Sequence, residues 1–182
     1  MKRFQLAAAA LIAVLTLFDA GVARAASASE LDAGAHAALS ALYAKAPAAR
    51  ALGEKARAIL VFPKMVKAGF VIGGQKGEGV LLEHGRPIAY YRSAGGSYGL
   101  QAGVQTYSYA MFLMTPAAVA YLDQNHGMEV GVGPSVVVAD QGMGKNLTTT
   151  TARKDVYAFI FGQSGLMAGA GLQGVKISRI QK

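Results

Sequence analysis

Glycines interrupt the apolar stretch from Phe62 to Leu82 at positions where a β-strand would normally carry side chains. Five of them alternate with short apolar runs: Gly69, Gly73, Gly74, Gly77 and Gly79. Glycine weakens a strand, so a strand rich in glycine usually has another backbone or a ligand lying close to it. The stretch therefore predicts a sheet that is built around close contacts at glycine.

A second glycine pattern occurs twice. The motif G-L-x-A-G spans residues 99–103 and recurs 66 positions later as residues 165–169, each time at the start of a β-rich segment. The repeat suggests two related halves. We predict that the following glycines are structural: Gly69, Gly73, Gly99, Gly103, Gly165 and Gly169.

The N-terminal half of the chain opens with two predicted helices. Ser29 and Asp32 fit a capping box for a helix that reaches about Lys45. Pro47 is placed at the first turn of a second helix that reaches about Ala58. Each helix has an apolar side, which indicates packing against a sheet, with membrane contact as the alternative.

The rest of the chain alternates short β-like runs with turns. Thr115 as N-cap, Pro116 at the first position and Gly127 as the stop predict one inserted helix near 116–125. The predicted strands are Ile59–Phe62, Gly69–Gly73, Gly79–Glu83, Pro87–Arg92, Gly99–Met114, Glu129–Val132, Ser135–Ala139, Leu147–Thr151, Val156–Phe161, Leu166–Gly171 and Val175–Ile180, with turns at His84–Pro87 and Asp140–Gly142. Short connections favour antiparallel pairing. We expect an α+β fold: a mostly antiparallel, glycine-rich curved sheet or partial barrel, with the N-terminal helices packed on it.

The first 25 residues have the pattern of a secretory signal peptide. A basic start precedes the apolar run Leu6–Phe18, and Ala23-Arg24-Ala25 forms a cleavage site, with Ala28 as the second choice. The run is shorter than the roughly 20 apolar residues that a spanning helix needs. The chain has no cysteine, so it cannot be a lipoprotein. We expect a single domain over 26–182 that is periplasmic or secreted.

Basic residues are unevenly distributed along the chain. Residues 45–92 hold nine bases and three acids, residues 93–144 hold no base, and residues 145–182 hold six bases and one acid. Such asymmetry predicts a basic face that meets an anionic surface. The alternative is a generally basic, soluble periplasmic protein.

Catalytic and metal chemistry find little support in the sequence. His36, His84 and His126 are scattered, and none is paired in sequence with a nucleophile or a carboxylate. We therefore predict no enzyme activity, no cofactor and no metal site. Nucleic acid is not an expected partner, because no stacking aromatics interleave the bases and an exported protein does not meet this substrate.

The block Gly73–Gly79 lacks the residue order of a phosphate loop and is not followed by a helix. We interpret it as a tight glycine hairpin with Lys76 at its tip. Basic residues near an anionic membrane each contribute about 1 kcal/mol of attraction. The predicted lipid-binding residues lie in and beside this block: Lys64, Lys67, Lys76, Arg86 and Arg92.

Three segments of the chain resemble the signature blocks of the SYLF domain family. They read AILVFPKMVKAGFVIGGQKGEGVLL, GSYGLQAGVQ and FGQSGLMAGAGLQGVKI, and the similarity spans about Lys55 to Ile180. The chain departs from the family pattern at two places. Tyr90-Tyr91-Arg92-Ser93 stands where the family usually has Trp-Ser, and Met167 replaces an aromatic residue.

The resemblance implies a non-enzymatic, membrane-associated lipid-binding module. Eukaryotic relatives imply binding to phosphatidylinositol lipids, and fungal ones are described as actin-binding. Chemically similar ligands in a bacterial envelope are phosphatidylglycerol, cardiolipin and the phosphates of lipid A. The alternative is a structural or stress-related envelope protein that acts through protein–protein contacts.

Overall fold

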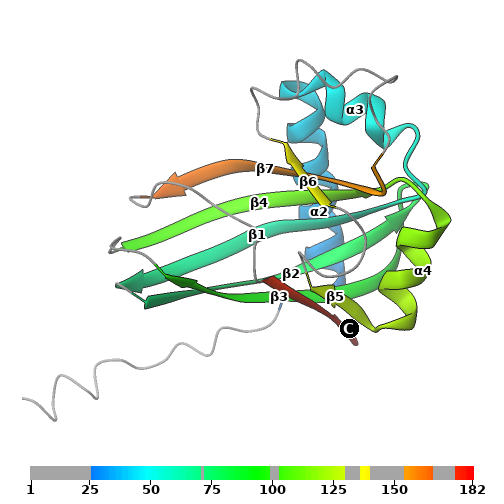
Figure 1. The fold of residues 1–182 in the computed structure, drawn as a ribbon. Coiled ribbons are helices and arrows are strands. Elements are labelled where there is room, and N and C mark those ends of the chain that lie inside the picture. Colours follow the sequence, from blue (N-terminus) through cyan, green and yellow to red (C-terminus); the bar gives the residue numbers. More distant parts are fainter. Residues whose placement is uncertain (1–25, 71, 99–102, 130–135, 140–153, 166–174) are drawn as a thin grey trace, which may run out of the picture.

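The computed structural model describes residues 26–70, 72–98, 103–129, 136–139, 154–165 and 175–182. The predicted signal peptide, Gly99, Gly169, the Asp140–Gly142 turn and the predicted strands Leu147–Thr151 and Leu166–Gly171 lie outside these ranges. The described elements are α2 (Ala28–Lys45), α3 (Pro47–Gly53), β1 (Ala58–Phe70), β2 (Ile72–Glu83), β3 (Arg86–Tyr98), β4 (Gly103–Leu113), α4 (Pro116–Gln124), β5 (Gly127–Glu129), β6 (Val136–Ala139), β7 (Val156–Gly165) and β8 (Val175–Ile180) (Figure 1).

The described strands form one open sheet in the order β5-β8-β3-β2-β1-β4-β7-β6. All neighbours pair antiparallel except β6 and β7, which are parallel. The predicted α+β class, with a mostly antiparallel sheet, is therefore confirmed. No helix within the described ranges has the length and apolar character needed to cross a membrane.

Two hydrophobic cores lie on opposite faces of the sheet. On the first, which we call the α2 face, α2 and α3 cover one end of the central strands (Figure 1). This core contains Leu31, Ala35, Leu39, Leu42, Ala46, Ala49, Leu52, Val61, Val80, Leu82, Ala110, Phe112, Tyr157, Phe159 and Phe161. The predicted packing of the N-terminal helices on the sheet is therefore confirmed.

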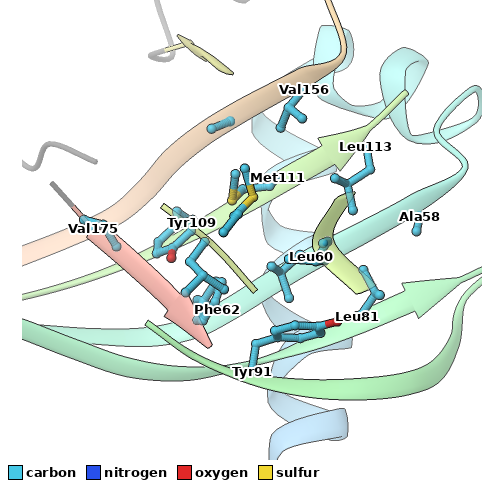
Figure 2. Close-up of a cluster of buried hydrophobic side chains, with 14 of the residues drawn as sticks. Ala58, Leu60, Phe62, Leu81, Tyr91, Tyr109, Met111, Leu113, Val156 and Val175 are labelled. Atoms are coloured by element: carbon cyan, nitrogen blue, oxygen red, sulfur yellow. The ribbon is translucent and has the colours of Figure 1, made fainter. Parts of the chain in front are cut away.

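The second core lies on the opposite face, which we call the α4 face. It combines side chains of β1 and β4 with Val156 of β7 and Val175 of β8 (Figure 2). Ala118 and Leu122 of α4 belong to the same core. Four strands separate β7 from β8 in the sheet order, yet Val156 and Val175 belong to this one cluster. The sheet is therefore curved around the α4 face.

Local chemistry explains the helix ends and corrects two predictions. The capping box is formed by Ser27 and Glu30, so α2 begins two residues earlier than Ser29 would place it. Helix α3 ends at Gly53 instead of about residue 58, because the following residues turn toward the sheet and Arg57 donates its backbone N–H to Leu113. Thr115 caps α4 as predicted.

The end of α4 differs from the prediction. The residue in the left-handed region is His126, with a φ of 50°, and Gly127 is already the first residue of β5. The φ of Gly127 is 146°, and an added Cβ would collide with the carbonyl oxygen of Ile177. Gly127 therefore permits close pairing of β5 with β8 rather than stopping the helix.

The predicted glycine hairpin over Gly73–Gly79 is wrong. These residues lie within β2, which is hydrogen-bonded to β1 on one side and to β3 on the other. Two ladders of backbone hydrogen bonds outweigh the weak strand preference of glycine. The hairpin predicted after β2 is confirmed, with His84 and Gly85 in the left-handed region at φ values of 49° and 76°.

The glycines of β2 on the α4 face accommodate large side chains of β1. The register of β1 slips around Pro63, so that Phe62 lies over Gly79 and Met65 over Gly77. An added Cβ at Gly79 would lie 2.6 Å from Cδ1 of Phe62 and 2.7 Å from the carbonyl oxygen of Val61. The predicted close contacts at glycine are thus packing contacts at these two positions.

Candidate anion-binding surface

Helices α2 and α3 cover only part of the α2 face, and exposed bases lie in register on the uncovered part. Lys76 and Lys176 flank Ala94 across three strands, and Lys64 and Arg92 flank Glu78 in the neighbouring row. We call the four bases Lys64, Lys76, Arg92 and Lys176 the basic face. The strand spacing places the two bases of each row about 10 Å apart. All four side chains are exposed.

Glu78 organises the centre of the basic face. Its side chain is only 18% exposed, and its two oxygens accept from Arg92 at 3.2 Å and from the Nζ of Lys182 at 2.6 Å. Partial burial acts to raise the pKa of the Glu78 carboxyl, but the hydrogen bonds and charges of Lys182 and Arg92 outweigh it and lower this pKa. Glu78 therefore remains ionised and holds two cations in place.

Glu78→Gln is expected to destabilise the protein at neutral pH by about 1 kcal/mol, or about 2–4 °C in melting temperature. The folded pKa of Glu78 is lowered, so its contribution is present above the unfolded value, about pH 4.3, and is lost as the pH falls through the folded pKa. Thermal melts of both proteins from about pH 7 to about pH 3 should therefore converge. Glu83→Gln, an exposed change in the same strand, is the control, and a pH-independent difference would contradict the assignment.

The structure separates the five predicted lipid-binding residues into three places. Lys64, Lys76 and Arg92 lie together on the basic face. Lys67 lies opposite Gln75 and Gln105 on the α4 face. The register slip in β1 puts Met65 on this face, and Lys67, two residues later, is on the same face. Arg86 is exposed at the start of β3, six residues from Arg92 or about 20 Å along the strand.

Two bases of the C-terminal segment were missed as site residues. Lys176 joins the basic face because β8 pairs with β3, and Lys182 bonds Glu78 and the carbonyl oxygen of Ala26. The sequence did contain a signal, since residues 145–182 are rich in bases. The pairing of β8 with β3 assigns these bases to the same surface, and no local pattern specifies it.

The predicted structural glycines form a row across three strands. Gly69 of β1 lies between Gly73 of β2 and Gly103 of β4, and Gly165 lies opposite Gln105 at the end of β7. The central sheet therefore has no side chains at three adjacent positions. The sequence pattern predicted such positions, because glycine in a strand permits another group to lie close to the backbone.

The histidines occupy three unrelated positions. His36 is exposed on α2, and His84 and His126 are exposed in turns. Among the described residues, no three His, Asp or Glu side chains gather closely enough to hold a metal ion.

Comparison with known families gives a match over the C-terminal part of the chain. Residues 94–182 match the family model Ysc84, which is described as "Las17-binding protein actin regulator". The matched region contains the second and third motif blocks, whereas the first glycine-rich block precedes it. The resemblance to the SYLF family is confirmed over this region. The comparison with curated proteins found no match.

Proposed function

Because residues 94–182 match the Ysc84 (SYLF) family, we propose that this protein is a non-enzymatic module that binds anionic lipid through the basic face. The observation that carries the proposal is the gathering of four exposed bases on the uncovered part of the α2 face. Each base near an anionic membrane adds about 1 kcal/mol of attraction.

The shape of this surface supports the proposal. Beyond the bases, the next row contains Gly96, Gly74, Ala68 and Val104 in register across four strands. Small side chains do not hold a membrane away from the sheet, and Val104 is an exposed apolar residue at 57%. The surface can therefore approach phosphate groups closely and still place an apolar side chain in the interface.

The proposal also has a consequence for the compartment and the lipids that the protein would meet. If residues 1–25 direct export, as the sequence predicts, the available partners are phosphatidylglycerol, cardiolipin and lipid A phosphates. The words "Las17-binding" and "actin regulator" in the family description support protein binding as the second candidate. Both candidates use a surface for recognition and need no catalytic group.

Sedimentation with vesicles tests the proposal. Purified protein should bind vesicles containing phosphatidylglycerol at about 0.1 M salt and release at about 1 M, because the screening length falls from about 10 Å to about 3 Å. Vesicles of phosphatidylcholine alone should not bind. The triple variant Lys64→Gln, Lys76→Gln, Lys176→Gln should bind about 100-fold more weakly, since it loses about 3 kcal/mol of attraction.

The matched control loses the same charge elsewhere. It carries Lys45→Gln, Lys55→Gln and Arg86→Gln, all exposed positions outside the basic face. Both triples should melt like the original protein, because exposed charges contribute little to stability. Equal losses of binding in the two triples would show a general charge effect. Binding that survives 1 M salt and the first triple would instead indicate insertion of an apolar surface.

A further inference from the structure

A pocket of about 500 Å³ lies between α4 and the end of the sheet where β2 turns into β3 (Figure 1). A hollow of this size is within the range of sites that bind small molecules. It opens on the α4 face, and the four bases of the basic face are not among its lining residues. The pocket is therefore separate from the proposed lipid-binding surface.

One wall of the pocket comes from α4. Pro116, Val119 and Ala120 line it, and their spacing of three and four residues places them on one side of the helix. Another side of the same helix, with Ala118 and Leu122, packs into the core. The core thus holds α4 in place while the first side faces the pocket.

The opposite wall comes from the turn end of β2 and β3. Leu81, Ala89 and the ring of Tyr91 provide an apolar floor, and Leu81 and Tyr91 lie side by side in Figure 2. The register between β2 and β3 shifts by one residue there, and Ile88 is the residue left unpaired. Bulges of this kind redirect a side chain. Ile88 is 47% exposed and lines the pocket.

Four charged side chains also line the pocket, and only two of them are paired. Asp123 and Arg179 form an ion pair at 2.6 Å that joins α4 to β8. Arg57 and Glu83 are exposed, and neither side chain has an ion-pair or hydrogen-bond partner among the residues that the structure describes. Arg86 lies opposite Glu83 in the register, but it forms no ion pair with it. One cation and one anion therefore stand unmatched beside an apolar floor.

The backbone positions of these two charges are fixed by the sheet. Arg57 donates its backbone N–H to the carbonyl oxygen of Leu113 at 2.8 Å. Ile59 pairs with Leu82, so Arg57, two residues before Ile59, and Glu83, one residue after Leu82, lie at the same end of the sheet. A small ligand can reach both side chains from one position in the pocket.

We propose that this pocket binds a zwitterion that carries an apolar chain, of the type of an apolar dipeptide. Arg57 binds the carboxylate, because its planar guanidinium matches that group with two parallel hydrogen bonds. Glu83 binds the ammonium, and the apolar side chains of the ligand cover Ile88 and Val119. A simple anion or a simple cation would leave one of the two charges unmatched. The ethanolamine head group of a phospholipid carries the same pair of charges, so it is the second source of this chemistry.

Calorimetry of the full protein with leucyl-leucine tests the pocket. The dipeptide should bind, whereas N-acetyl-leucyl-leucine, which lacks the ammonium, and leucyl-leucine amide, which lacks the carboxylate, should bind at least tenfold more weakly. Arg57→Gln and Glu83→Gln should each weaken leucyl-leucine binding at least tenfold, the loss expected for a charge-assisted hydrogen bond. In Glu83→Gln the preference for the dipeptide over its acetylated form should disappear. Both variants should melt like the original protein, because exposed charges contribute little to stability.

Two matched controls accompany these variants. Ala120→Phe fills the pocket from α4 and should abolish binding, whereas Ala117→Phe changes an exposed position of the same helix that does not line the pocket and should leave binding unchanged. Lys55→Gln removes an exposed charge two residues before Arg57, also outside the pocket, and should have no effect.

Glycerophosphoethanolamine is the second probe. Binding of this probe and not of the dipeptide, with the same dependence on Arg57 and Glu83, would identify the lipid head group as the source and would support the site. Absence of binding with both probes, or unchanged affinity in Arg57→Gln and Glu83→Gln, would overturn it. The vesicle test of the basic face changes none of the pocket residues, so the two proposals can fail separately.

Discussion

Gly79→Val is expected to destabilise the protein by about 3 kcal/mol or more, the upper range for overpacking a core. An added Cβ would lie 2.6 Å from the ring of Phe62 and 2.7 Å from the carbonyl oxygen of Val61. Phe62 cannot move aside easily, because it is fully buried and stacked on Tyr109 with ring centroids 4.4 Å apart. Chemical denaturation monitored by circular dichroism measures the loss.

Gly74→Val in the same strand is the matched control for this change. Its Cβ would meet only a carbonyl oxygen of Gly95 at 3.8 Å, which is an ordinary contact. Valine has a higher strand preference than glycine, so the control should be neutral or slightly stabilising. Equal stability losses at Gly74 and Gly79 would show that the glycines of β2 serve backbone conformation and not the packing of β1.

The second large effect is expected for Phe112→Ala, which should cost about 3–5 kcal/mol. Phe112 is fully buried beneath the N-terminal helices. Its ring packs edge-on against Phe159, with centroids 5.6 Å apart, and near Tyr43 of α2 at 6.4 Å. Truncation leaves a cavity between the sheet and α2, which hydrogen exchange of α2 amides should detect as faster opening.

Val104→Ala lies in the same strand and is the control, because Val104 is exposed. It should change stability by less than about 0.5 kcal/mol. Unchanged stability of Phe112→Ala would mean that the apolar side of α2 is not held by the sheet. The alternative use of that helix, contact with a membrane, would then regain support.

The helix starts and the tight turn could be predicted from the sequence, because they depend on residues that are close together along the chain. Thr115 and Pro116 start α4, Pro47 starts α3, and the turn at Gly85 joins β2 to β3 as expected. Each depends on the conformational preference of one residue or on one short-range hydrogen bond. Such features need no knowledge of the partner strand, and they were predicted correctly apart from shifts of a few residues.

The strand character of Gly73–Gly79 and the faces of the lysines in β1 were not predicted, because they depend on pairing between strands. Glycines suggested a turn at Gly73–Gly79, but hydrogen bonds to β1 and β3 make this segment a strand interior. The register slip near Pro63 places Lys67 on the α4 face and Lys64 on the α2 face, and without it the two lysines would exchange faces. A bulge of one residue reverses the face of everything that follows it, and hydrophobic patterning alone does not locate such a bulge.

The position of β8 has a consequence for how the chain folds. Strands β1, β2 and β3 follow one another along the chain and pair as neighbours, whereas β8 pairs with β3 and places Ile180 opposite Tyr90. Pairing β8 with β3 closes the long segment of chain between these two strands into a loop. Loop closure costs entropy before the contacts between β8 and β3 offset it, which slows folding to the millisecond-to-second range typical of non-local sheets. Until β8 pairs with β3, one edge of β3 has unpaired backbone groups, and a strand of a second unfolded chain can pair with that edge. Refolding should therefore lose yield as protein concentration rises.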